Sequence, residues 1–241
     1  MPQQDIAEQR PGPPPAAAPE PRQRWRAVFG RTAAAPSLPH REVVEALEHA
    51  LTDSALPLLR DTRRGGRPRL TFGAPLPIGM VVDLEQFDLW LTELRPAGAV
   101  RAALVDALAP GYALHDVYDV WLGAAALPAS VIGAEYRVVL DTAVGADEVA
   151  AAIASLLAAE VLPRQRDKGS GTVAYDLRPL LAGLELLGGD TPVLRIEVRF
   201  DPARGSGRPE EVVAAISEVL DRPLVAAETR RIRLIVDEAG G

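Results

Sequence analysis

Three titratable side chains, His40, Glu42 and Asp88, have the residue types that general acid–base catalysis uses. A histidine beside a carboxylate can accept and donate a proton near neutral pH. His40, however, stands at the start of an expected helix, where polar side chains commonly bind free backbone amides. We therefore predict no catalytic residue. The alternative is an enzyme that uses these three residues on an RNA or small-molecule substrate.

Arginine dominates two short stretches, although the chain of 241 residues has a net charge of −7. The first stretch has five arginines and one aspartate, and it contains Gly65 and Gly66, a pair that favours a hairpin. Guanidinium groups on a hairpin can bind phosphates through two parallel hydrogen bonds. An acidic face of a partner protein and plain solvated loops are the alternatives. The residues expected to contact RNA or a partner are Arg60, Arg63, Arg64, Arg67, Arg69, Arg164, Arg166, Lys168 and Arg178.

The composition excludes several classes of site. The chain has no cysteine, so disulfides, cysteine nucleophiles, thiolate zinc sites and self-ligated iron–sulfur clusters are excluded. With only three histidines besides, we expect neither a metal nor another cofactor. No apolar stretch approaches the ~20 residues that cross a bilayer, and the N-terminus lacks the pattern of a secretory signal. A cytoplasmic location without membrane contact is the expectation.

Hydrophobic periodicity indicates the elements that must position these residues. Apolar residues recur at the helical period in the segments 40–51, 96–108, 146–159 and 208–220. β-like runs lie between them, and in 193–200 apolar and charged residues alternate most regularly. The order strand–helix–strand–strand–helix–strand appears twice, which is the split βαβ order of a ferredoxin-like unit. We predict an α+β fold of two ferredoxin-like units, with two antiparallel sheets that helices cover on one face.

The domain organisation follows from these segments. Residues 1–22 hold seven of the 22 prolines and no aromatic residue, so we expect this segment to be disordered. Trp25, Trp90 and Trp121 fall in strand-like runs, and we expect them in the core or on a sheet face. The other expected divisions are a first unit at 23–123, a linker at 124–133, a second unit at 134–237 and a tail at 238–241.

Several stretches of the sequence together resemble a known family. They read LPHRE at 38–42, RPRLTF at 67–72, LPIG at 76–79, FD at 87–88 and DLRPL at 176–180. Their order and spacing resemble the radical SAM-linked protein family, a radical SAM-associated domain of unknown function. The resemblance covers about residues 24–236.

The chain departs from the family pattern at two places. Near the first stretch the family pattern resembles Gly-His-Leu-Asp, of which only His40 remains here. A Phe-Asn-Pro-His-Pro-type stretch is replaced by GGRP at 65–68, without its asparagine and histidine. The resemblance implies an accessory protein in RNA metabolism that works beside a radical SAM enzyme. Radical SAM chemistry itself needs a cluster held by three cysteines, and the chain has none.

Overall fold

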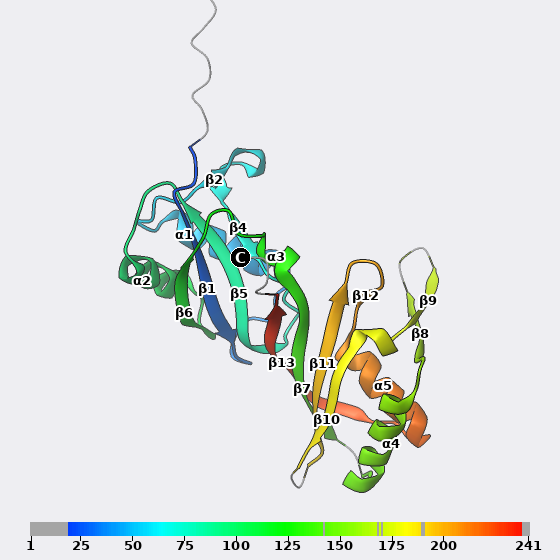
Figure 1. The fold of residues 1–241 in the computed structure, drawn as a ribbon. Helices are drawn as coiled ribbons and strands as arrows, with labels where there is room; N and C mark the ends of the chain where they lie inside the picture. Colours follow the sequence, from blue (N-terminus) through cyan, green and yellow to red (C-terminus); the bar gives the residue numbers. More distant parts are fainter. Residues whose placement is uncertain (1–18, 142, 168, 170, 189–190, 238–241) are drawn as a thin grey trace, which may run out of the picture.

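The computed structural model describes residues 19–141, 143–167, 169, 171–188 and 191–237, so most of the expected tail at 1–22 and all of 238–241 lie outside the described residues. The described chain forms an α+β fold with one large, mostly antiparallel sheet (Figure 1). Its strands are β1 Gln23–Arg31, β2 Arg60–Asp61, β3 Arg67–Pro68, β4 Leu70–Phe72, β5 Val81–Leu91, β6 Tyr112–Val120, β7 Val131–Asp141, β8 Pro163–Asp167, β9 Thr172–Asp176, β10 Leu181–Leu187, β11 Val193–Asp201, β12 Gly205–Ser206 and β13 Val225–Val236.

The helices bury narrow apolar stripes, as the periodicity predicts. In α1 the buried apolar residues are Val43, Leu47 and Leu51, which lie on one face at the helical period. Among the described residues, no helix has the length and hydrophobicity needed to cross a membrane. The helices are α1 His40–Thr52, α2 Ala97–Ala107, α3 Leu127–Ser130, α4 Ala146–Ala158 and α5 Pro209–Leu220, with 3-10 turns η1 Thr62–Arg64 and η2 Arg178–Leu180.

The sheet consists of two sets of strands joined edge to edge. The strands of the first half lie in the order β4-β5-β1-β6 and those of the second half in the order β10-β11-β7-β13, with antiparallel neighbours. β13 then pairs in parallel with β5, where Arg231 lies opposite Val82. The two separate sheets of the prediction are therefore one continuous sheet. The long strand β5 makes this joint because β4 pairs with one of its ends and β13 with the other.

Each half has its own hydrophobic core. The first core lies between the sheet and helices α1 and α2, and it contains the contacting rings of Phe29, Phe72 and Phe87. The second lies between the sheet and helices α4 and α5. Burying a large aliphatic or aromatic side chain contributes ~1.5–3 kcal/mol to the free energy of folding. One such cluster in each half therefore gives that half a stable scaffold.

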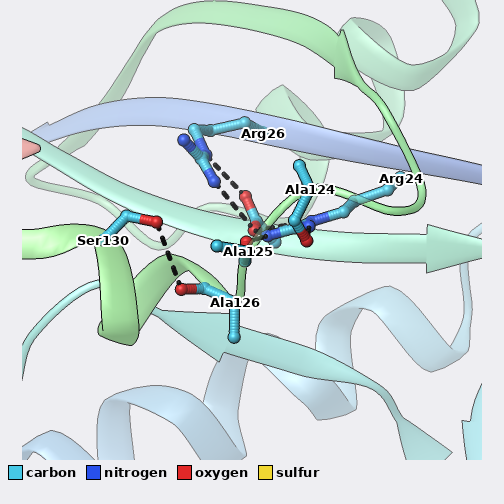
Figure 2. A network of polar contacts seen from close by, with 7 residues as sticks. Arg24, Arg26, Ala124, Ala125, Ala126 and Ser130 are labelled. Carbon is cyan, nitrogen blue, oxygen red and sulfur yellow. Dashed lines mark hydrogen bonds and ion pairs between the residues drawn. The ribbon is translucent and has the colours of Figure 1, made fainter. Parts of the chain in front are cut away.

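The expected linker at 124–133 is an ordered segment. It contains α3 and the first residues of β7, and Leu127 is fully buried in the second core. The carbonyl oxygens of Ala124 and Ala125 accept hydrogen bonds from the Arg24 side chain, and the Ser130 hydroxyl donates to the carbonyl of Ala126 (Figure 2). The bonds from Arg24 attach the segment to β1 of the first half, and the Ser130 bond closes the turn of α3.

Candidate functional site

Asp88, one of the three acid–base candidates, belongs to a buried ion-pair network. Its carboxylate is fully buried, with Oδ2 2.6 Å from Nη2 of Arg24 and Oδ1 2.8 Å from Nε of Arg26. Figure 2 shows the two guanidinium groups converging on this point beside the 124–126 segment. Because all four hydrogen bonds to the carboxylate come from Arg24 and Arg26, Asp88 holds β1, β5 and this segment together rather than facing a ligand.

His40 lies on the other face of the sheet. Its Nδ1 accepts a hydrogen bond from the backbone N–H of Leu76 at 3.3 Å. Its ring is nearly perpendicular to the Phe72 ring, with the two ring centroids 5.2 Å apart. Phe72 stacks on Phe87, and successive residues of a strand point to opposite faces, so Asp88 points away from His40. Glu42 is exposed on α1. The three acid–base candidates therefore do not form one pocket.

His40 connects three of the stretches that carry the family resemblance. The histidine comes from the 38–42 stretch, whereas Phe72 and Leu76 come from the stretches at 67–72 and 76–79. Burial lowers the pKa of His40, and the nearby positive charge of Arg231 lowers it further. A neutral imidazole can accept the Leu76 hydrogen bond through Nδ1, so the histidine anchors the LPIG turn.

The first arginine stretch forms a β-hairpin of β2, η1 and β3, but carboxylates of α1 neutralise part of it. Arg64 Nη1 lies 2.9 Å from Oε1 of the buried Glu48, and Arg67 Nη1 lies 3.2 Å from Oε1 of Glu45. Arg69 stacks over the Trp90 ring at 4.3 Å. The exposed side chain of Arg63 has no carboxylate partner among the described residues.

A groove of about 810 Å³ separates this hairpin from the start of α1. We call it the hairpin groove and define it by its polar lining, which is His40, Arg41, Glu45, Arg64 and Arg67. Hydrogen bonds from Arg41 and Arg67 lower the pKa of Glu45, the single carboxylate in this lining. The groove therefore presents more cationic than anionic groups to solvent.

The second arginine cluster has other contacts. Arg164 Nη1 lies 2.7 Å from Oε2 of Glu218 on α5, and the Arg166 guanidinium lies over the Tyr175 ring at 4.7 Å. Lys168 lies outside the described residues. The β8–β9 hairpin extends from the second half and the β2–β3 hairpin from the first, and the two hairpins lie far apart in Figure 1. Arg178 donates to the carbonyls of Leu157 and Ala159 and so holds the end of α4.

A larger cavity, of about 940 Å³, lies where the two halves meet. We call it the junction cavity. The LPIG turn, α3, β7, the end of β11 and the start of α5 form its walls, with Leu76, Pro128, Tyr136, Phe200, Glu210 and Arg231 among its lining residues. Within the described residues, no cluster of histidine and carboxylate side chains could hold a metal ion.

The floor of the junction cavity is a buried charge cluster. Arg231 donates through Nε to Oε1 of Glu85 and through Nη2 to the carbonyl of Pro75, the latter at 3.2 Å. The side chains of Arg231 and Glu85 are almost fully buried. Burial raises the pKa of Glu85 to about 7, although the positive charges of Arg231 and Arg31 oppose this shift. Burial also raises the pKa of Tyr136. Buried titratable groups beside a cavity are a typical arrangement of binding and catalytic sites.

Residues 24–215 match the model of DUF2344, a family described as uncharacterized proteins conserved in bacteria. The chain belongs to this family. The DUF2344 match includes His40, the hairpin groove, Glu85 and Tyr136, whereas Arg231 lies beyond its end. No curated protein matches the sequence.

Among solved structures, the DUF2344 chain is similar to chains of H/ACA ribonucleoprotein structures. One is an archaeal box H/ACA Nop10–Cbf5 complex, with 13% identity, a TM-score of 0.44 and coverage of 85% of this chain and 46% of that chain. Another is a Cbf5–Nop10–Gar1 complex, with 13% identity, a TM-score of 0.48 and coverage of 86% and 48%. The DUF2344 chain thus spans about half the length of these chains.

Sequence reasoning missed the floor of the junction cavity. Arg231 and Glu85 lie in strands, where charged residues alternating with apolar ones indicate a solvent-facing side. The missing signal is the pairing of β13 with β5, which places both side chains inside the fold of this DUF2344 protein. The LPIG stretch at 76–79, which carries part of the family resemblance, borders this region, since Leu76 and Pro77 line the cavity.

Proposed function

We propose that this protein is a non-catalytic accessory protein that contacts the backbone of an RNA through its β2–β3 hairpin. The resemblance to radical SAM-linked proteins adds a radical SAM enzyme as the partner that acts on this RNA.

Each half would be a ferredoxin-like unit. The order β4-β5-β1-β6, with two helices between its strands in sequence, supports this assignment, as does the order β10-β11-β7-β13.

The excess of arginine on the β2–β3 hairpin, beside the hairpin groove, carries this proposal. Around the groove, Arg41, Arg60, Arg63, Arg64 and Arg67 oppose the carboxylates Glu45, Glu48 and Asp61, although the chain as a whole is acidic. The ion pairs with Glu48 keep Arg64 and Arg67 in place. The exposed guanidinium groups of Arg60 and Arg63 remain available for phosphate oxygens, which arginine binds in a planar, bidentate geometry.

Removing these two charges is expected to weaken RNA binding in a salt-dependent way. The double variant Arg60→Gln/Arg63→Gln removes two phosphate contacts, so the slope of log K against log salt should become shallower by about 1.5. Fluorescence anisotropy of a labelled RNA hairpin over a salt series measures this slope. Both side chains are exposed and neither neutralises a buried carboxylate, so the variant should fold normally.

The matched control removes two exposed arginines of the second half, Arg204→Gln/Arg222→Gln. Their side chains are 63% and 56% exposed, and each pairs with an exposed or half-exposed carboxylate. This variant has the same net charge as the hairpin variant, and its salt slope should equal that of the wild type. Equal slopes for all three proteins would contradict RNA contact by the hairpin. An acidic protein that binds the wild type but not the hairpin variant would then be the better explanation of the groove.

A further inference from the structure

The junction cavity has the size and wall chemistry of a small-molecule site. Its volume of about 940 Å³ lies within the ~300–1,000 Å³ that is usual for ligand pockets. Pro75, Pro77, Pro128 and Phe200 contribute rigid apolar surface to its walls. A planar ring can pack against such surface, because burial of its apolar faces is favourable.

Two buried arginines lie at or directly behind the floor of the cavity. Arg231 lines the cavity and is 3% exposed. Arg31, which is 2% exposed, lies behind the cavity wall and donates to the carbonyl oxygens of Pro77 and Met80, two residues of the lining. Arg231 is paired with the buried carboxylate of Glu85, whereas Arg31 has no ion pair among the described residues. Nη1 of Arg31 is buried without a hydrogen-bond partner among the described residues. A buried charge of this kind is costly unless it is paired, so the floor favours an anionic group nearby.

The start of α5 adds donors at the cavity wall. Arg208 occupies the N-cap position, its side chain does not cap the helix, and Pro209 follows it. The next backbone N–H groups, those of Glu210 and Glu211, therefore lack a side-chain acceptor within the described part of the chain. The exposed side chain of Arg208 also lines the cavity. Backbone N–H groups at a helix start together with arginine form a typical environment for phosphate.

Three carboxylates line the cavity and limit which anion fits. Asp201 already accepts hydrogen bonds from the backbone N–H groups of Ala203 and Arg204 and from the Arg204 side chain. Glu210 and Glu211 line the cavity near the same helix start, and the charge of Glu210 acts on the Tyr136 hydroxyl. A bare inorganic anion would meet their repulsion. A ligand with a phosphate at one end and hydroxyl or amino donors elsewhere would instead donate hydrogen bonds to these carboxylates.

We propose that the junction cavity binds one nucleotide, with the phosphate near Arg231, Arg208 and the start of α5, and with the base against the proline-rich wall. The ribose hydroxyls or base amino groups would donate to Glu210 and Glu211. The nucleotide can be a free nucleoside monophosphate or the phosphorylated end of an RNA, since both offer the same groups. This inference goes beyond the hairpin contact, because it concerns a different set of side chains.

Isothermal titration calorimetry of the full chain with AMP, GMP, CMP and UMP tests the proposal. We expect at least one of them to bind, and its nucleoside and inorganic phosphate each to bind about tenfold or more weakly, because each lacks one of the recognised groups. An RNA bearing a terminal 5′-phosphate that competes with the nucleotide would identify an RNA end as the ligand. A lack of competition would identify the free nucleotide.

Two variants locate the binding site without touching the buried floor. Ala129→Trp fills the cavity from an exposed position on α3 and should abolish nucleotide binding, whereas Ala129→Ser should bind as the wild type does. Arg208→Gln should weaken binding about tenfold through loss of a charged hydrogen bond.

The proposal is wrong if no nucleotide binds at millimolar concentration, if inorganic phosphate binds as tightly as the nucleotide, or if Ala129→Trp binds it unchanged. The hairpin variant Arg60→Gln/Arg63→Gln should keep full nucleotide affinity. A failure of the hairpin proposal and a failure of the cavity proposal therefore give different results.

Discussion

Replacement of Asp88 by alanine is expected to destabilise the protein by about 3–5 kcal/mol, the usual cost of breaking a buried ion pair from one side. The carboxylate is fully buried and receives both Arg24 and Arg26. Without it, the guanidinium of Arg24, which is 2% exposed, keeps only the two carbonyl acceptors at Ala124 and Ala125. Equilibrium unfolding in guanidinium chloride, followed by circular dichroism, measures the loss.

Asp116→Ala is the matched control for this prediction. Asp116 is also an aspartate in a strand of the first half, but its side chain is 63% exposed and its ion pair with Arg101 is long, at 3.7 Å. Its replacement should change the free energy of unfolding by no more than ~0.5 kcal/mol. If Asp88→Ala cost less than ~1 kcal/mol, the buried network would not hold the 124–126 segment, and Asp88 would again be a candidate for chemistry.

Local patterns in the sequence predicted the elements but not how the two halves join. The alternation at 193–200 predicted β11, and the apolar stripe at 40–51 predicted α1, because each pattern reflects burial of one face. The parallel contact of β13 with β5 leaves no such trace, since pairing at an edge changes which backbone groups bond without changing the periodicity. Trp121 shows the same limit: it was expected in the core or on a sheet face, and its side chain is 72% exposed just after β6 ends.

The candidate site was predictable only where charge itself was the signal. The arginine hairpin could be read from composition, but its pairing with Glu45 and Glu48 depends on how α1 packs beside it. Arg231 could not be read at all. The register of β13 against β7 shifts between Arg231 and Arg233, so Arg231 and Leu234, three residues apart, are both buried. In a regular strand, buried and exposed residues alternate, and buried positions are predicted from this alternation. The register shift interrupts the alternation at Arg231.

Glu85 is expected to make the stability of the protein fall as the pH rises from about 4.5 to about 7. In the folded state its pKa is raised to about 7 by burial, whereas in the unfolded chain it is near 4.5. Between these values the folded state keeps the proton and the unfolded state loses it, so stability decreases with pH in this window and is constant above it. Since one pKa unit corresponds to about 1.4 kcal/mol, the total decrease is about 3 kcal/mol.

Comparison with Glu85→Gln isolates this effect from the other titrating groups. Arg31 and Arg231 face Glu85 and stay charged, Tyr136 stays neutral in this range, and His40 has a lowered pKa that acts in the opposite direction below pH 6.5. The variant retains His40, so the difference in unfolding free energy between wild type and variant should fall by about 3 kcal/mol from pH 4.5 to pH 8. Glu93→Gln, at an exposed position, should show no such trend. A difference that is flat with pH would mean that Glu85 is ionised throughout. Glu85 would then neutralise Arg231 over the whole pH range, and the cavity floor would offer less positive charge to a bound anion.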